Sequence, residues 1–427
     1  MAKEYFTYQG SEGFIEGCRV RDLAERFGTP LYLYSENAIR ERVACFQKVF
    51  AEISPIIRYS CKANSNPHLL KILKESGCGA DVISPGELSL ALYAGFTPGE
   101  IIMGGVGKSG DEITFALKQG VTLFSVESLS ELDVLSRKAG EQGRVVIVLL
   151  RLNPDIPAGG HHYIETGRKE NKFGLTEDEI ISVFKDLQRY PRVKMGGLHL
   201  HLGSQIANPE PYLQAISEAR RLHKIYSFEY LDLGGGFPVA YERNVADIEV
   251  FSSAICKAIL EWKLASPPGL PFPESEAGCG GLKVIFEPGR FFVADAGFLL
   301  TRVIYRKDRP HKKFLIVDAG MNDLIRPALY EAYHHIWPVR ETEGKEVHFE
   351  VVGPVCESGD FLAKDRSLPE GIKENDLLLA GEAGAYGFAM SSNYNGRLRP
   401  AEVMLSGEKA RLIRPRETLE DLYLKKP

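Results

Sequence analysis

One lysine, Lys62, has the sequence surroundings of a reactive amine. It stands in Arg58-Tyr-Ser-Cys-Lys-Ala-Asn-Ser-Asn-Pro67, where apolar and β-favouring residues predict a buried strand over 56–61 and the following Asn, Ser and Pro residues predict a turn. Lys62 would therefore end the strand. Burial disfavours an ammonium and lowers its pKa, and such a lysine is a good nucleophile towards an aldehyde. A strand-end lysine whose amine reaches solvent is the simpler alternative.

Two histidines, His199 and His201, belong to a second apolar run and fall on the same side of an extended strand. Paired histidines can bind a metal ion, but no third ligand with obvious spacing follows them. The sequence therefore predicts no metal site. Either histidine alone would also suit the core of a protein.

Two turns rich in glycine or charge close later apolar runs. Leu233-Gly-Gly-Gly-Phe-Pro238 would let backbone N–H groups approach a phosphate. Phe286-Glu-Pro-Gly-Arg290 places a carboxylate and a guanidinium three residues apart, and the two can simply pair with each other. Next to a nucleophilic lysine, Glu287 could instead keep a pyridine nitrogen protonated while Arg290 binds an anionic oxygen. With His201 against the ring face, these features indicate pyridoxal 5'-phosphate as cofactor.

Short apolar runs alternate with stretches of helical spacing from residue 31 onward. The eight runs cover residues 56–61, 80–84, 101–105, 123–126, 145–152, 195–202, 230–233 and 284–286. This alternation predicts a (β/α)8 barrel of the TIM type over residues 31–290, in which the carboxyl ends of the strands bring the candidate residues to one pocket. A doubly wound open sheet is the alternative architecture.

The alternation of apolar runs with helical patterns ends after residue 290. β-rich runs at 291–305, 313–318, 347–352, 377–380 and 401–405 follow without helical patterns of comparable length between them. This predicts an antiparallel β-domain over residues 291–427, and we expect the N-terminal segment, residues 1–30, to pack with it. The predicted fold class is therefore α/β plus β.

Composition and charge narrow the class of protein. The 427 residues include 44% hydrophobic and 26% charged side chains with a net charge of −5, which gives no footprint for a nucleic-acid or membrane partner. The seven cysteines form no CxxC pair and predict free thiols in a reducing compartment. The amino terminus carries no signal-like pattern and no apolar run reaches the ~20 residues of a membrane span, so we expect a cytoplasmic protein.

The chain resembles the barrel-type pyridoxal-phosphate decarboxylases, and within that family it is most similar to the diaminopimelate decarboxylases. The similarity extends over nearly the whole chain, from Tyr-Ser-Cys-Lys-Ala-Asn64 through Glu-Pro-Gly-Arg290 to Asn393-Tyr-Asn395. It implies a carboxy-lyase that converts meso-2,6-diaminopimelate to L-lysine and carbon dioxide, the last step of lysine biosynthesis. Ser60 and Cys61 stand where the family commonly has Ala and Val, and both are small enough to preserve the strand.

The resemblance also implies roles for individual residues. Those implied to hold the cofactor are Lys62, His201, Ser204, Gly236, Glu287, Pro288, Gly289, Arg290 and Tyr386, and those implied to bind substrate are Arg290, Arg326, Tyr330, Glu357 and Tyr386. Lys62 would form a Schiff base, His201 would stack on the ring and Cys356 would be the proton donor. In the family, the residues that correspond to Cys356 and Glu357 come from the second subunit. The resemblance therefore implies a homodimer with shared active sites.

Two other functions stay open. The chain could decarboxylate another amino acid, such as a carboxylated polyamine, ornithine, arginine or carrier-bound glutamate, although Arg326-Pro-Ala-Leu-Tyr330 and Cys356-Glu-Ser358 argue against this. It could also be a non-catalytic binding homologue, which would be expected to have lost Lys62 or Cys356. A polar, glycine-containing loop around residues 155–175 could act as a lid.

Overall fold

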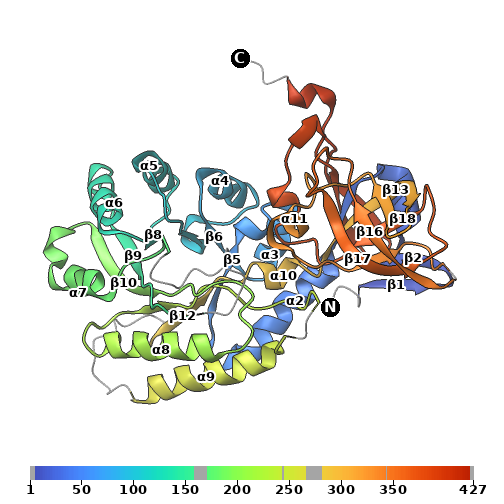
Figure 1. The fold of residues 1–427 in the computed structure, drawn as a ribbon. Helices are drawn as coiled ribbons and strands as arrows, with labels where there is room; N and C mark the ends of the chain where they lie inside the picture. The colour runs from blue at the N-terminus through green and yellow to red at the C-terminus, as the bar shows by residue number, and fades with distance from the viewer. Residues whose placement is uncertain (1–4, 158–170, 243–244, 266–280, 343, 424–427) are drawn as a thin grey trace. The chain divides into compact units, whose positions relative to one another are not determined.

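A computed structural model describes residues 5–157, 171–242, 245–265, 281–342 and 344–423 of the chain. The chain divides into two compact units (Figure 1). The first unit comprises Met1–Arg42, Val239–Asn244 and Arg290–Pro427, and the second comprises Val43–Pro238 and Val245–Gly289. Most of the loop predicted as a lid, at residues 158–170, lies outside the described residues.

The second unit is a closed barrel of parallel strands. Within the described residues its eight strands are β5 (Ile56–Ser60), β6 (Gly79–Val82), β7 (Ile101–Met103), β8 (Leu123–Val126), β9 (Val146–Arg151), β10 (Val193–His199), β11 (Tyr230–Asp232) and β12 (Lys283–Phe286). They pair in this order, and β12 pairs with β5 to close the barrel. Each strand coincides with one of the predicted apolar runs. The predicted barrel is therefore confirmed, and a doubly wound open sheet is excluded.

Helices connect the strands and pack around the barrel (Figure 1). They are α2 (Glu36–Val49), which precedes β5, then α3 (Pro67–Glu75), α4 (Pro85–Tyr93), α5 (Gly110–Lys118), α6 (Leu129–Glu141), α7 (Glu177–Lys185), α8 (Glu210–His223) and α9 (Ile248–Ala265). Several begin at a side chain that accepts a hydrogen bond from the first turn, as Ser109 does for α5 and Thr176 for α7. These caps satisfy backbone donors that the helix itself leaves without partners, and so fix where each helix begins.

The interior of the barrel changes from apolar to polar along the strands. Alternation along β5 turns Ile56, Arg58 and Ser60 to the same side. Ile56 packs against an apolar cluster made of Ile102, Leu123, Leu149 and Ile285. At the other end of β5, the Ser60 hydroxyl donates a hydrogen bond of 2.7 Å to the Asp81 carboxylate. The polar layer thus lies at the carboxyl ends of the strands, where barrel enzymes carry their chemistry.

The first unit is built on a mixed β-sheet. Its strands are β4 (Leu31–Ser35), β13 (Gly297–Asp308), β14 (Lys313–Val317), β15 (Ile336–Pro338), β16 (Glu346–Val352), β17 (Phe361–Pro369), β18 (Leu377–Ala380), β19 (Ala401–Ser406) and β20 (Lys409–Arg414). The order is β17-β16-β14-β13-β4-β19-β20, and β18 pairs with β13 and β15. Two pairings, β14 with β16 and β4 with β19, are parallel rather than antiparallel as expected. Pairing direction depends on the connections between strands, which local periodicity does not reveal.

The N-terminal segment packs into the first unit. It forms the small sheet β1 (Phe6–Gln9), β2 (Glu12–Ile15) and β3 (Cys18–Arg19), followed by α1 (Val20–Phe27). Its side chains Phe6, Ile15 and Leu23 share one apolar core with Leu33 and Phe298. Strand β4 also belongs to this unit, because it pairs with β13 and β19, so the expected start of the barrel at residue 31 is too early. β4 is buried along its whole length, and such a strand reads like a barrel strand in the sequence.

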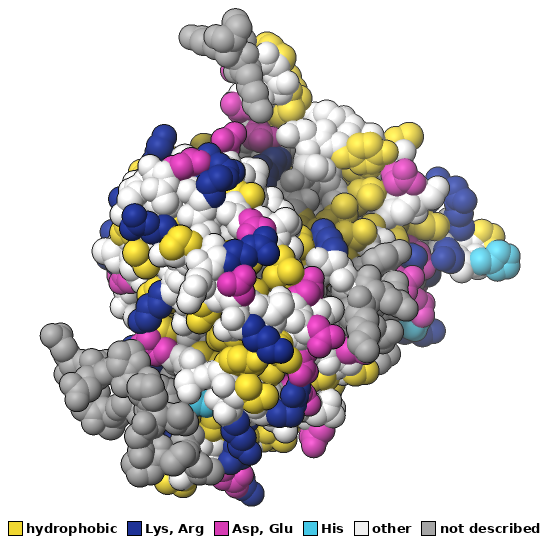
Figure 2. All heavy atoms as spheres, turned by 90° about the vertical axis from the view of Figure 1, so that its left-hand side faces the viewer, with side chains coloured by type: hydrophobic (Ala, Val, Ile, Leu, Met, Phe, Trp, Pro, Cys, Tyr) yellow, Lys and Arg dark blue, Asp and Glu magenta, His cyan; other side chains and the backbone are white. Residues whose placement is uncertain are grey.

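The outer face of the barrel unit carries charges of both signs. Figure 2 shows Lys and Arg side chains interspersed with Asp and Glu over this face. Exposed pairs include Arg137 with Glu141 at 2.6 Å and Arg189 with Asp133 at 2.7 Å. Such pairs stabilise a protein by ~1 kcal/mol or less. Separately, the described part of the chain has no helix that is both long enough and apolar enough to cross a membrane.

Candidate active site

Lys62 lies directly after β5, on a short 3₁₀ turn over Cys61–Ala63, and is half-buried. The next helix, α3, begins at Asn66, whose side chain accepts a hydrogen bond from the backbone of His68. A strand end and a capped helix therefore hold the backbone on both sides of the lysine. Burial lowers the pKa of the His201 imidazole well below its ordinary value, and the Lys62 ammonium lowers that pKa further. His201 is therefore neutral and lies within electrostatic reach of the lysine.

Three buried carboxyl groups lie in the polar layer of the barrel, on Asp81, Asp232 and Glu287. Burial and the neighbouring Glu287 raise the pKa of Asp81 to about 6 and that of Asp232 well above its ordinary value. Burial also opposes ionisation of Glu287, but His199 and Lys62 outweigh it and hold the pKa of Glu287 below its ordinary range. At neutral pH, Glu287 is therefore anionic, whereas the environment of Asp232 favours its neutral form.

His199, at the end of β10, connects Glu287 with β8. Its Nδ1 lies 2.6 Å from the Ser125 hydroxyl oxygen, and its Nε2 lies 3.4 Å from a carboxylate oxygen of Glu287. Burial opposes protonation of the ring, yet Glu287 and Asp232 together raise the pKa of His199 above its ordinary value. The serine fixes the ring orientation, and the ring then stabilises the negative charge on Glu287.

His199, His201 and Glu287 also form a cluster that could hold a metal ion, because their ligand atoms all lie within 4.8 Å of one another. In the sequence, no third metal ligand with obvious spacing accompanied the two histidines. Glu287 joins them only through closure of the barrel, so spacing along the chain did not reveal it. Two of the three side chains are also those that the family resemblance assigns to a cofactor ring. The expectation of no metal therefore stays a prediction.

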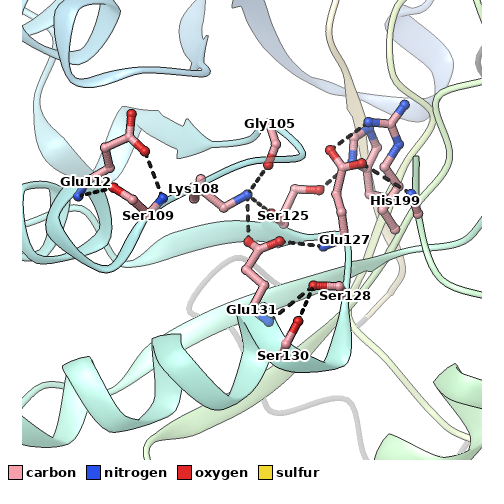
Figure 3. Close-up of polar contacts among 12 residues, drawn as sticks. Gly105, Lys108, Ser109, Glu112, Ser125, Glu127, Ser128, Ser130, Glu131 and His199 are labelled. Carbon is pink, nitrogen blue, oxygen red and sulfur yellow. Dashed lines mark hydrogen bonds and ion pairs between the residues drawn. The ribbon is translucent and has the colours of Figure 1, made fainter. Parts of the chain in front are cut away.

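A second group of buried charges supports the end of β8. The Lys108 ammonium forms an ion pair of 2.7 Å with Glu131 and donates a hydrogen bond of 2.7 Å to the Ser125 carbonyl (Figure 3). Arg151 forms a buried ion pair of 2.8 Å with Glu127. Buried charges are tolerated when they are paired in this way. The network holds the backbone that presents the serine hydroxyl to the histidine, and no pattern in the sequence pointed to it.

The glycine turn, Gly234–Gly236, follows β11. Its φ is +65° at the first glycine and +102° at the third, where a Cβ would lie 2.6 Å from the Gly203 carbonyl oxygen. The Gly235 N–H donates to Nδ1 of His201 at 3.2 Å, and the Gly235 carbonyl accepts a 2.6 Å hydrogen bond from the Tyr212 hydroxyl. A Cβ on Gly234 would lie 2.6 Å from Nδ1 of His201, so only glycine lets this backbone lie so close to the imidazole. A glycine turn of this kind can approach the phosphate of pyridoxal phosphate closely.

The remaining predicted cofactor residues of the barrel lie on two loops. Ser204 is half-buried in the loop after β10. The Pro288 carbonyl accepts a 3.3 Å hydrogen bond from the Ser60 backbone, and a Cβ on Gly289 would lie 3.0 Å from the Ser60 Cβ and 3.1 Å from the Ala63 Cβ. The turn that follows Glu287 therefore packs closely against the end of the lysine-bearing strand. A larger residue than glycine would push the two apart.

Two arginines of the first unit, Arg290 and Arg326, meet around Tyr241. Arg290 donates a 2.9 Å hydrogen bond to the Tyr241 hydroxyl, and its guanidinium lies 4.8 Å from the Tyr386 ring centroid. Arg326 lies 4.5 Å from the Tyr241 ring centroid and 2.9 Å from Nε2 of His334. The Nε of Arg326 has no hydrogen-bond partner among the described residues. Sequence reasoning missed Tyr241 and His334, which carry no motif, and the cluster is suited to binding an anionic group.

The other residues predicted to bind substrate are Tyr330, Cys356 and Glu357. Tyr330 ends α11 (Arg326–Tyr330) and is half-buried. Cys356 and Glu357 are exposed, and the Cys356 N–H donates a 2.8 Å hydrogen bond to the side chain of Asn395. The backbone of this loop is thus held, while its thiol and carboxylate are accessible in the single chain.

Asp323 supports the turn before α11 and makes stability depend on pH. It is 1% exposed and accepts a 2.9 Å hydrogen bond from the Gly320 N–H, and burial raises its pKa from 3.8 to about 7. The native protein therefore keeps this proton up to about pH 7, whereas the unfolded chain releases it near pH 4. Between these values, this group makes the free energy of unfolding fall as pH rises, by roughly 2 to 4 kcal/mol.

We expect Asp323→Asn to remove this part of the pH dependence. Urea unfolding between pH 5 and 8, followed by circular dichroism, measures it, with Asp133→Asn on the barrel surface as the control. The wild type should lose stability relative to Asp323→Asn as pH rises. Parallel curves for these two proteins would contradict the raised pKa.

Comparison with known proteins gives the family. Residues 36–294 match the family described as "Pyridoxal-dependent decarboxylase, pyridoxal binding domain". A diaminopimelate decarboxylase of Aquifex aeolicus (strain VF5) is 42% identical over 429 residues, covering 99% of this chain and 97% of the relative. The chain belongs to the diaminopimelate decarboxylase family of pyridoxal-dependent decarboxylases. The family predicted from the sequence is confirmed.

Solved structures of family members have the same fold. Diaminopimelate decarboxylase from Helicobacter pylori, complexed with L-lysine, is 37% identical with a TM-score of 0.86, covering 95% of this chain and 98% of that chain. The enzyme from M. jannaschii, also in complex with L-lysine, is 32% identical with a TM-score of 0.90, covering 100% and 98% of the two chains. The shared architecture therefore includes both the barrel unit and the sheet unit.

Proposed function

We propose that this protein decarboxylates meso-2,6-diaminopimelate to L-lysine and carbon dioxide with pyridoxal 5'-phosphate as cofactor, the last step of lysine biosynthesis. The observation that carries the proposal is the set of Lys62, His201 and Glu287 at the carboxyl end of the barrel, next to a glycine turn. Relatives named for this activity are 42 and 43% identical over 99 and 95% of the chain. A non-catalytic homologue would not be expected to keep this set.

The barrel side chains fit the cofactor group by group. The Lys62 amine would bind the aldehyde, and the backbone of Gly234–Gly236, which carries no side chains, would approach the phosphate together with Ser204. His201 is neutral, so it can lie against the ring face without opposing a positive charge on the ring. When bound, pyridoxal phosphate accepts the electrons that remain after carbon dioxide leaves.

Glu287 would hold the proton on the ring nitrogen. Its carboxylate is anionic, and two neighbours support that state: His199 lies 3.4 Å away, and the raised pKa of Asp232 favours a neutral carboxyl group that can donate a hydrogen bond. A negative carboxylate at the ring nitrogen favours the protonated pyridine, which is the stronger electron acceptor. The same contacts argue that Glu287 serves the cofactor rather than a metal ion.

Substrate recognition would use residues of the first unit. The anion-binding cluster of Arg290 and Arg326 would bind substrate carboxylates with Tyr330 and Tyr386, because a buried guanidinium needs an anionic partner. Cys356 would return a proton to the carbon that loses carbon dioxide. Glu357 would pair with the distal ammonium of the substrate.

We also propose that the enzyme is a cytoplasmic homodimer in which Cys356 and Glu357 act in the active site of the other subunit. Their exposure in the single chain leaves both side chains accessible to a partner. Among the described residues, Cys18, Cys61, Cys78, Cys256 and Cys356 are free thiols, which fits a reducing compartment.

Substrate preference tests the proposed function. The purified protein, loaded with pyridoxal phosphate, should release carbon dioxide and L-lysine from meso-diaminopimelate, with kcat/KM at least ~100-fold above that for ornithine or L-lysine. Those two amino acids lack the distal carboxylate and would leave Arg326 without an anion. Arg326→Gln should lower the preference, while Arg137→Gln on the barrel surface should leave it unchanged. Equal turnover of ornithine or lysine would contradict the proposal.

A further inference from the structure

Arg58 is a charged residue inside the barrel that the proposed reaction does not use. It lies in the middle of β5, on the same side of the strand as Ile56 and Ser60, and is only 7% exposed. Its register partner on β6 is Gly79. A Cβ on that glycine would lie 3.2 Å from Nη1 of Arg58 and 2.4 Å from the Glu100 carbonyl oxygen. The missing side chain therefore leaves room for the guanidinium.

The hydrogen-bonding capacity of Arg58 is almost unused. Nη2 donates to the Gly99 carbonyl at 3.4 Å, which is long for a hydrogen bond, and Nε and Nη1 have no partner within the described residues. A guanidinium offers five N–H donors, and leaving a buried charge without partners is costly. Asp232, Glu287 and Asp81 favour its charge through space, but none of them forms a hydrogen bond to it.

A cavity of about 620 Å³ lies beside this guanidinium, at the amino-terminal end of the barrel strands. It is lined by residues that include Arg58, Lys74, Gln47, Gly79, Gly99 and Glu100. The Lys74 ammonium already donates one hydrogen bond, to the Gly95 carbonyl, and keeps two further N–H groups. The cavity thus offers donors from two cations.

Glu100 is the acidic residue among those that line the cavity. Its carboxylate accepts hydrogen bonds from the Thr97 N–H and hydroxyl at 2.6 and 2.8 Å, which ties it to the capping box of its own turn. It is therefore not available to neutralise Arg58 by a direct contact. The cavity lining thus carries two positive charges, on Arg58 and Lys74, and one negative charge, on Glu100, so its net charge is positive.

We propose that this cavity binds a small oxyanion, a phosphate or a carboxylate, held by Arg58 and Lys74 at the end of the barrel opposite Lys62. A carboxylate or phosphate matches the planar fork of a guanidinium with two parallel hydrogen bonds, which chloride cannot do. The anion would supply the partner that the described residues do not give to Arg58. Because Arg58 lies on β5, which leads directly into the turn that bears Lys62, an occupied cavity would also stabilise the strand that precedes the reactive amine.

Anion titration of the holoenzyme tests this site. Bound pyridoxal phosphate keeps inorganic phosphate out of the glycine turn, and comparison with Arg58→Gln separates this cavity from the anion-binding cluster of Arg290 and Arg326. We expect inorganic phosphate or acetate, but not chloride at the same ionic strength, to raise the midpoint of thermal unfolding saturably. If phosphate raises the midpoint more than acetate does, the cavity is a phosphate site, and the reverse order indicates a carboxylate site. Arg58→Gln should weaken binding at least ~10-fold, as expected for the loss of a charged hydrogen-bonding partner, and Arg137→Gln should not.

Two further measurements cover the case in which Arg58→Gln does not fold. Lys74→Gln, at a half-buried helix position, should weaken binding measurably by calorimetry. Crystals of the wild type soaked in selenate should give an anomalous peak within hydrogen-bonding distance of the Arg58 guanidinium. No saturable response of the wild type to either anion, or a response of undiminished strength in Arg58→Gln, would overturn the site and leave the proposed decarboxylase activity untouched.

Discussion

Replacing Lys62 by alanine is expected to abolish decarboxylation of meso-diaminopimelate, with kcat lower by ~10⁴-fold or more, because the amine that binds the cofactor aldehyde is lost. Lys108, a second described lysine near the polar layer, cannot take its place. Its ammonium is held by Glu131 at 2.7 Å and by the Gly105 and Ser125 carbonyls at 2.6 and 2.7 Å. Among the described residues, Lys108 is therefore not a second candidate for this role.

A covalent label separates this role from a structural one. Borohydride treatment of the wild-type holoenzyme, followed by peptide mass spectrometry, should place the reduced cofactor on Lys62. Lys62→Ala should carry no label, and Lys71→Ala, an exposed position on α3, should be labelled like the wild type. A label on a different lysine, or substantial activity in Lys62→Ala, would refute the assigned role.

Mixing variants tests the proposed shared site. Lys62→Ala and Cys356→Ala subunits should each be inactive as homodimers. Random reassociation should restore about a quarter of wild-type activity, because half of the dimers are mixed and each mixed dimer has one intact site. No recovery, despite subunit exchange shown by native mass spectrometry, would place both residues in the same subunit's site.

Replacing Glu287 by glutamine is expected to lower kcat by ~10²- to 10³-fold while the covalent label on Lys62 is retained. Glutamine is close in size but cannot carry the negative charge that favours a proton on the ring nitrogen. It also leaves His199, whose Nε2 lies 3.4 Å from the carboxylate, without its anion. The visible absorbance of the bound cofactor should remain, with a changed dependence on pH.

Asp232→Asn is the matched control for this charge. Burial and Glu287 raise the pKa of Asp232 well above its ordinary value, which favours the neutral carboxyl group in the wild type. An asparagine amide can donate to Glu287 in the same way, and activity should fall by less than ~10-fold. If Asp232→Asn were as damaging as Glu287→Gln, the negative charge would reside on Asp232, and the assignment would be reversed.

The amino-acid sequence by itself determined the barrel and named the candidate residues for its chemistry. Each barrel strand is an apolar run closed by polar or glycine residues, and this pattern is local, so it survives without any knowledge of the fold. The same locality placed Lys62 after β5 and Glu287 after β12, and marked the glycine turn. The same local pattern gave a wrong start for the barrel at β4. A strand buried on both faces has the same sequence pattern in a barrel and in the centre of a sheet.

Only the tertiary structure decided which groups face one another. Ser125 and His199 belong to β8 and the end of β10, strands that flank β9 in the barrel, and Asp232 approaches Glu287 through β11 and β12. Likewise, Arg58 reads as one polar residue in a strand until the barrel closes over it. Closure removes water from these groups, and without water their charges depend on partners that sequence spacing does not encode.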